Sequence, residues 1–127
     1  MRYLTAEQVV FIHDQETPGR PLLFPDRLDA AVAAPRQTYD GQELYPTIHL
    51  KAAAILRGIA RGHPFEKGNK RCALNCTYAF YAFNGWRLTM SDTDLIHVIV
   101  DTILERWEVE KIAERLELGV EELPDPE

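Results

Sequence analysis

Apolar residues recur every three to four positions along most of the chain, which is the spacing of amphipathic helices. The pattern predicts six helices, at about residues 5–14, 26–33, 47–61, 69–84, 92–107 and 108–118. Thr5 and Gln8 form a capping-box pattern at the first start, Pro35 stops the second helix, and Gly62 is expected to end the third. The sequence shows no strand-rich region or internal repeat, so we predict an all-α bundle of about six helices.

Two segments of this pattern stand out. The predicted helix at 69–84 is apolar around most of its circumference, which is typical of the buried centre of a bundle. Asp40-Gly41 lies between residues that can be extended, which predicts a hairpin or tight turn within 36–45. Such an element is either a flap over a site or only a connector. We expect one domain over residues 1–127, with a tail from about 119 that includes Pro124-Asp125-Pro126.

Length and composition fit one soluble globular domain, since the chain has 127 residues of which 46% are hydrophobic. The apolar stretches are too short to span a membrane, and the N-terminus lacks the apolar core of a signal peptide. A cytoplasmic protein is therefore expected. Cys72 and Cys76 lie four positions apart on one predicted helix, which favours reduced core thiols. The alternative is a metal site, although no second ligand pair lies nearby.

Charge is distributed unevenly along the chain. The net charge is −6, from 20 acidic and 14 basic residues. Basic residues nevertheless concentrate between positions 51 and 71, at Lys51, Arg57, Arg61, Lys67, Lys70 and Arg71. This local excess favours binding of a small polyanion such as a nucleotide over a long nucleic-acid footprint, and direct nucleic-acid binding is not expected.

The stretch from His63 to Arg71 is the candidate functional site. Gly68 can adopt backbone angles that other residues avoid, and the first amides of the helix that follows lack partners within the helix. These amides favour an anion, and Lys70 and Arg71 would add full charges beside it. The alternative is a simple turn with solvated cations and a structural His63.

Two further histidines lie near predicted helix ends. His13 is interpreted either as a functional residue or as an exposed histidine that suits the helix dipole. His49 is expected to be a surface or capping residue rather than a catalytic one.

The stretch His63–Arg71 resembles the signature of the Fic superfamily, and specifically of its short Doc (death-on-curing) branch. That motif runs His, any residue, Phe, two residues, Gly or Ala, Asn, Lys, Arg, and Lys70 is typical of the Doc branch. The resemblance extends to Leu28–Ala31, Pro35–Gln37, Lys51–Ala53 and Phe83–Gly85, and it covers roughly residues 1 to 117.

The resemblance implies nucleotide-dependent transfer onto a protein hydroxyl. Doc-type toxins use ATP to phosphorylate a Thr of translation elongation factor Tu and are held inactive by a Phd-type antitoxin. Fic enzymes instead transfer AMP from ATP to Ser, Thr or Tyr. Carried over by position, the implied roles are a base at His63, loop packing by Phe65, oxyanion-type amides and a loop-fixing side chain at Gly68 and Asn69, and phosphate neutralisation by Lys70 and Arg71.

The chain departs from the family pattern at the metal-binding position. The family has Asp or Glu two residues after the Phe, where it binds Mg²⁺, whereas this chain has Lys67 and offers only Glu66 as a candidate ligand. Leu74 replaces a second Arg of some Fic proteins, which argues against AMP transfer. Three hypotheses follow: a Doc-like toxin kinase, an AMP-transferring enzyme, and a catalytically silent binding module.

Overall fold

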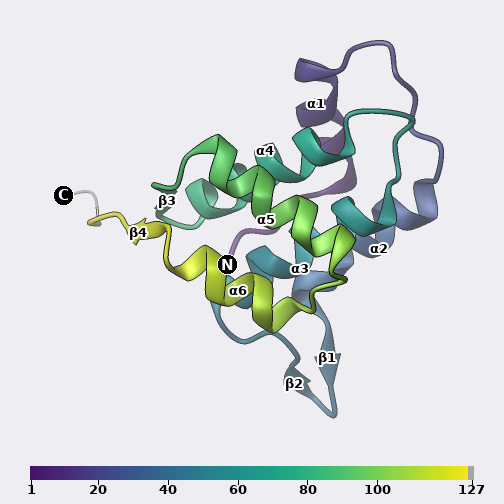
Figure 1. Ribbon diagram of the computed structural model, residues 1–127. Helices are drawn as coiled ribbons and strands as arrows, with labels where there is room; N and C mark the ends of the chain where they lie inside the picture. The colour runs from purple at the N-terminus through teal and green to yellow at the C-terminus, as the bar shows by residue number, and fades with distance from the viewer. Residues whose placement is uncertain (126–127) are drawn as a thin grey trace.

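The computed structural model describes residues 1–125 and consists mainly of helices packed into one bundle (Figure 1). The helical elements are α1 (Ala6–Glu16), α2 (Pro25–Ala33), the 3-10 turn η1 (Ala34–Arg36), α3 (Ile48–Gly62), α4 (Asn69–Phe83), α5 (Asp92–Leu104) and α6 (Val109–Glu117). The all-α class and the six predicted α-helices are confirmed. The capping box is also present, since Thr5 Oγ1 accepts from Gln8 N at 3.1 Å and Gln8 Oε1 accepts from Thr5 N at 2.9 Å.

Helix α3 lies at the centre of the bundle and packs against α2, α4, α5 and α6 (Figure 1). Small residues allow this close packing: a Cβ added at Gly58 would lie 2.8 Å from Ala31 Cα on α2. The apolar circumference of α4 had predicted that α4, rather than α3, lies at the centre of the bundle. Helix α4 is indeed largely buried, but its last residue Phe83, expected to be part of the apolar face, is 38% exposed.

The end of α5 differs from the predicted boundary. The helix ends at Leu104 rather than near Trp107, and Arg106 takes a left-handed backbone conformation with φ 53° before α6 begins. No Gly or Pro marks this break in the sequence, because residues 105–108 are Glu-Arg-Trp-Glu. The turn matters for the site, since it brings Arg106 to face α3.

The predicted hairpin is present. Strands β1 (Thr38–Tyr39) and β2 (Gln42–Glu43) pair antiparallel, with Thr38 opposite Glu43. Asp40 and Gly41 both have positive φ, 53° and 80°, which is the conformation that an Asp-Gly hairpin turn requires.

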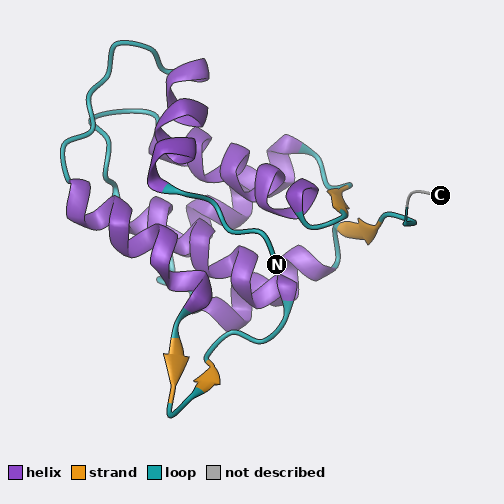
Figure 2. Cartoon of the chain, turned by 180° about the vertical axis from the view of Figure 1, so that it is seen from behind, coloured by secondary structure: helices purple, strands orange, loops and turns teal. Residues whose placement is uncertain are grey.

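A second strand pair was not predicted. Strands β3 (Trp86–Leu88) and β4 (Val120–Glu122) pair antiparallel, so the segment expected to be a tail from about 119 begins with a paired strand. Residues 126 and 127, the end of that predicted tail, lie outside the described residues. Figure 2 shows the two strand pairs at separate edges of the bundle.

Two further features of the described residues bear on the sequence predictions. No helix among residues 1–125 combines the length and apolar character needed to cross a membrane. Cys72 and Cys76 are both buried and free, with their Sγ atoms 3.9 Å apart, as expected of unbridged core thiols.

Candidate functional site

His63 lies at the point where α3 ends. The helix continues through Gly62, and the left-handed conformation that closes it falls one residue later than expected, on His63 with φ 51° and ψ 53°. A residue with a Cβ is strained there by about 1–2 kcal/mol. Arg27 Nη1 donates to the Gly62 carbonyl at 3.2 Å and fixes the helix end. The side chain of His63 is consequently exposed and borders a cavity.

The loop after His63 is held by backbone hydrogen bonds to the segment that precedes α2. Leu23 N and Phe24 N both donate to the Pro64 carbonyl, at 2.9 and 3.0 Å, and Glu66 N donates to the Pro21 carbonyl at 3.0 Å. Because two segments far apart in sequence are joined in this way, the loop that carries His63 is fixed in place.

Asn69 holds the same loop from inside the protein. Asn69 is a buried residue, with 3% of its surface exposed. Its Oδ1 accepts from Phe65 N at 3.0 Å and its Nδ2 donates to the Phe65 carbonyl at 2.8 Å. Phe65 itself is buried in the core. The loop-fixing contact of Asn69 and the packing of Phe65 are thus both present in the structure.

His13 also supports the loop, which sequence reasoning missed. We had expected an exposed or functional histidine, but His13 is 1% exposed and stacks on Phe65, with ring centroids 3.7 Å apart and an interplanar angle of 5°. Its Nε2 lies 2.8 Å from the Lys67 carbonyl. Since a carbonyl can only accept, Nε2 is the donor of this bond, and Nδ1 on the other side of the ring lies 3.0 Å from Asp14 Oδ1. The expectation of exposure was wrong because α1 packs against α4 and covers the ring.

The start of α4 forms the expected turn. Gly68 is the N-cap residue with φ 83°, and no side chain of the described residues caps this helix end. A Cβ at Gly68 would lie 2.4 Å from Thr17 Oγ1, so both the backbone angle and the packing require glycine. The first amides of α4 are therefore available to an anion.

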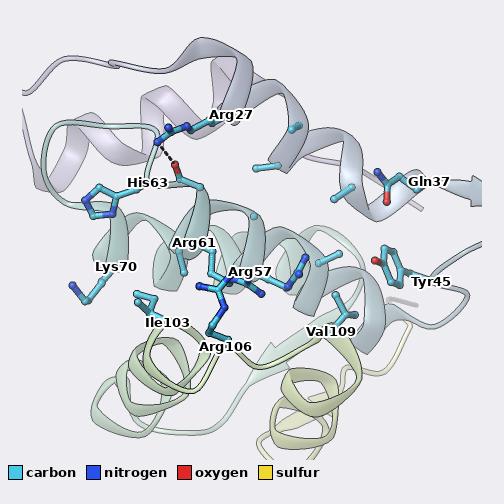
Figure 3. Close-up of a pocket in the computed structure, with 17 residues that line it drawn as sticks. Arg27, Gln37, Tyr45, Arg57, Arg61, His63, Lys70, Ile103, Arg106 and Val109 are labelled. Carbon is cyan, nitrogen blue, oxygen red and sulfur yellow. Dashed lines mark hydrogen bonds between the residues drawn. The ribbon is translucent and has the colours of Figure 1, made fainter.

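An open cavity of about 690 Å³ extends from this end of α3 (Figure 3). His63 and Lys70 lie at one end of it, and Gln37 and Tyr45, which flank the β1–β2 hairpin, lie at the other. The hairpin that we considered as a flap therefore adjoins the cavity at its base. The charged side chains among the described residues that line the cavity are all cationic: Arg27, Arg57, Arg61, Lys70 and Arg106.

Three of these arginines form a cluster in the middle of the cavity, Arg57, Arg61 and Arg106 (Figure 3). Arg57 Nη2 pairs with Glu108 Oε2 at 3.1 Å. Partial burial, together with the charges of Arg57 and Arg106, lowers the pKa of Arg61, and the carboxylate of Glu108 opposes this shift. Arg57 Nε and Arg61 Nη1 are shielded from solvent and donate to no group within residues 1–125. Within the described residues, the cluster thus has more positive charge than paired carboxylates balance. It also has more hydrogen-bond donors than protein acceptors.

The remaining residues predicted for the site lie outside the cavity. Arg71 is exposed, and its guanidinium is 3.8 Å from Asp92 on α5. Lys67 is exposed on the loop, and the carboxylate of the neighbouring Glu66 pairs with Arg20 at 2.9 Å. The structure therefore brings together His63, Lys70 and the start of α4, but not Arg71.

Lys51 and His49, both on α3, make contacts that hold the fold together. Lys51 is 1% exposed, and its Nζ binds Glu43 Oε1 at 2.8 Å and the Tyr45 carbonyl. It anchors the hairpin to α3, so it does not contribute to the basic excess of residues 51–71 that was expected to bind a polyanion. His49 Nδ1 lies 2.9 Å from the Tyr81 hydroxyl and does not line the cavity.

The side chains near His63 do not fit a protein-held Mg²⁺ site. Magnesium is bound through oxygen ligands, usually including carboxylates. Lys67 stands at the position where the family has an acid, and Glu66 is engaged with Arg20. Within residues 1–125, no group of three or more His, Cys, Asp or Glu side chains is placed to hold a metal ion.

Comparison with known proteins identifies relatives for the part of the chain that contains His63 and the start of α4. Residues 3–81 match the model of the Fic/DOC family. The chain is 39% identical over 80 residues to Toxin Doc of Mycolicibacterium smegmatis, with 62% of each chain covered. It is 29% identical over 89 residues to Protein kinase doc of Escherichia phage P1, with 67% of this chain and 70% of that one covered. The match thus spans less than two thirds of the length of the mycobacterial relative.

Proposed function

Because this chain belongs to the Fic/DOC family, we propose that it is the toxin of a toxin–antitoxin pair and transfers a phosphoryl group from ATP to a Ser or Thr hydroxyl of a translation factor, elongation factor Tu. The observation that carries the proposal is the position of His63. Its exposed imidazole borders a cationic cavity, next to the uncapped start of α4. The names of the two relatives, a toxin and a protein kinase, support the same function.

In the proposed reaction, His63 accepts the proton of the target hydroxyl, which imidazole can do near neutral pH. The hydroxyl oxygen then forms a bond to the γ-phosphorus of ATP, the bond from that phosphorus to the β–γ bridging oxygen breaks, and ADP leaves. The amides at the start of α4 and the ammonium of Lys70 stabilise the negative charge on the transferred group. Exposure of His63 suits a protein substrate, since a large target must reach the imidazole.

Transfer of AMP to a protein hydroxyl is the second candidate function. The same base would then direct the hydroxyl to the α-phosphorus, and pyrophosphate would leave. The observation that favours phosphoryl transfer is Leu74, which occupies the position of the second Arg of some Fic proteins. Leu74 is fully buried in the core, so a side chain at this position faces packing rather than the cavity.

A catalytically silent binding module is the third candidate, and Lys67 favours it. If phosphate transfer requires a metal held by an acid at this position, the wild-type protein has no turnover. Under this alternative, the fold serves to bind a nucleotide or an antitoxin.

The partners proposed for the toxin are a Phd-like antitoxin and elongation factor Tu, in the cytoplasm, with no direct contact to nucleic acid or membrane. An antitoxin is proposed because Doc toxins act within toxin–antitoxin pairs. A small reading frame beside this gene whose product binds the protein and relieves its toxicity would support this partner.

The function is tested with ATP labelled at either the α- or the γ-phosphate and with purified elongation factor Tu. We expect only the γ label to reach the target, and we expect His63→Ala to lower the rate by roughly 10²–10⁴-fold, the usual contribution of a general base. His97→Ala is the matched control, because His97 is an exposed histidine on α5 that does not line the cavity. Transfer of the α label would identify the AMP reaction, and undiminished transfer by His63→Ala would exclude His63 as the base.

The silent alternative is tested with Lys67→Asp. If the wild type transfers neither label, while Lys67→Asp transfers one of them in the presence of Mg²⁺, the wild-type protein is a binding module. If the wild type is active, the silent alternative is excluded.

A further inference from the structure

We propose that Arg57, Arg61 and Arg106 form a second phosphate-binding site, which holds the polyphosphate chain of a nucleotide without a divalent cation. This inference rests on the proposed function, because it concerns the nucleotide whose phosphoryl group reacts beside His63. It adds three binding residues that lie outside the stretch His63–Arg71.

The charge of the cavity is the first argument. Its lining includes five Arg or Lys residues and, among the described residues, no Asp or Glu, although the whole protein has a net charge of −6. Like charges held close together repel, and partial burial strengthens that repulsion. Burial and, after it, the charges of Arg57 and Arg106 lower the pKa of Arg61, and the carboxylate of Glu108 opposes this shift. Within residues 1–125, Arg57 is the one cavity-lining cation with an ion-paired carboxylate, Glu108, so a bound polyanion would neutralise charge that these residues leave uncompensated.

The placement of the three arginines is the second argument. Arg57 and Arg61 lie four residues apart on α3 and therefore on the same face of the helix. At 1.5 Å per residue, positions 57 and 63 are separated by about 9 Å along the helix axis. Arg106 approaches from the turn between α5 and α6 on the opposite wall (Figure 3). The cluster thus continues from the reacting histidine along the cavity, as a chain of phosphates would.

Unsatisfied hydrogen-bond donors are the third argument. Arg57 Nε and Arg61 Nη1 are shielded from solvent and find no acceptor within residues 1–125. Buried donors are nearly always paired in folded proteins, so an unpaired one requires an explanation. Phosphate oxygens are suitable acceptors, because the planar guanidinium fork matches their spacing.

Among the described residues, the side chains near His63 do not include the carboxylates that would hold Mg²⁺, so the phosphate charge must be neutralised by another group. Nucleotide enzymes commonly neutralise the phosphate chain with Mg²⁺. Here Lys67 stands in place of the expected acid and Glu66 is paired with Arg20. Three guanidinium groups supply the positive charge that a metal ion would otherwise bring.

The test is isothermal titration calorimetry of ATP into the full-length protein, once in EDTA and once in Mg²⁺. We expect the two dissociation constants to agree within about threefold. Arg57→Gln, Arg61→Gln and Arg106→Gln should each weaken ATP binding in EDTA by about tenfold or more, the usual loss for a charge-assisted hydrogen bond. Arg115→Gln is the matched control and should bind as the wild type does, because Arg115 is on α6 and does not line this cavity. AMP binding should change less than ATP binding in all three variants.

ATP binding that requires Mg²⁺ would overturn the proposal, as would arginine variants that bind ATP as tightly as Arg115→Gln. Should a variant fail to fold, competition on the wild type still decides: tripolyphosphate in EDTA must displace ATP, and failure to do so refutes the site. The proposed function fails separately, since a protein that binds ATP in the predicted manner but transfers no label refutes the reaction and leaves the binding site standing.

Discussion

Replacing Asn69 with alanine tests whether the loop that carries His63 is held by a single buried side chain. Asn69 makes two hydrogen bonds to the backbone of Phe65, one as acceptor at 3.0 Å and one as donor at 2.8 Å. Alanine removes both and leaves a buried N–H and a buried carbonyl without partners.

The magnitude follows from these two groups. Each buried polar group left unpaired costs about 1–3 kcal/mol, so we expect Asn69→Ala to lower the free energy of unfolding by roughly 2–6 kcal/mol. For a domain of this size, that loss corresponds to a fall in Tm of roughly 10–20 °C. The loop should also lose its fixed geometry, so phosphoryl transfer should fall more steeply than the fraction of folded protein.

Urea unfolding followed by circular dichroism measures the loss of stability, and transfer assays under strongly native conditions measure activity. Asn84→Ala is the matched control. The side chain of Asn84 also makes hydrogen bonds to the backbone: Oδ1 accepts from Arg2 N, and Nδ2 donates to the Arg2 and Phe80 carbonyls. It lies, however, at the other end of α4. Asn84→Ala should destabilise the protein while the folded fraction keeps its activity.

Equal stability of Asn69→Ala and the wild type would refute the hydrogen-bonding argument. A variant that is destabilised as expected but retains full activity when folded would refute the link between Asn69 and the position of His63.

Three further predictions concern other parts of the fold. Lys51→Met should lower stability by about 1–3 kcal/mol in thermal or urea unfolding, because the Tyr45 carbonyl loses its donor and the hairpin is freed from α3, while the half-exposed carboxylate of Glu43 is solvated by water. Gly68→Ala should cost about 1–3 kcal/mol through its left-handed backbone and the clash with Thr17, and Thr17→Ala should recover part of that loss. Burial, with a smaller contribution from a nearby carboxylate, raises the pKa of Tyr81 above its ordinary value of 10.0. The unfolded state therefore loses this proton first, so stability should fall by up to about 1.4 kcal/mol per pH unit above pH 10, and Tyr81→Phe should flatten that slope.

The features that could be predicted from the sequence are those set by neighbouring residues. The capping box at Thr5, the turn at Asp40-Gly41 and the glycine before α4 each depend on a few consecutive positions, and all three are present in the structure. The stretch from His63 to Arg71 could be singled out for the same reason, since its residues are consecutive in the sequence, and its role in binding and catalysis stays a prediction.

The features that were missed depend on contacts between distant residues. His13 and Lys67 are 54 positions apart, and Arg106 is 45 positions from Arg61. Periodicity reports which face of a helix is apolar, but it does not report which element that face meets. For this reason the support of the loop by His13, the arginine cluster and the pairing of β3 with β4 became visible only in three dimensions.

The left-handed backbone of His63 has a consequence for how mutations at this codon would behave. Exchange for glycine removes the steric penalty of a Cβ at this position, so the protein that has lost its imidazole should also be the more stable one. The His63→Gly variant would then accumulate as folded protein rather than being degraded. Under the proposed function, such a protein would continue to occupy the proposed antitoxin.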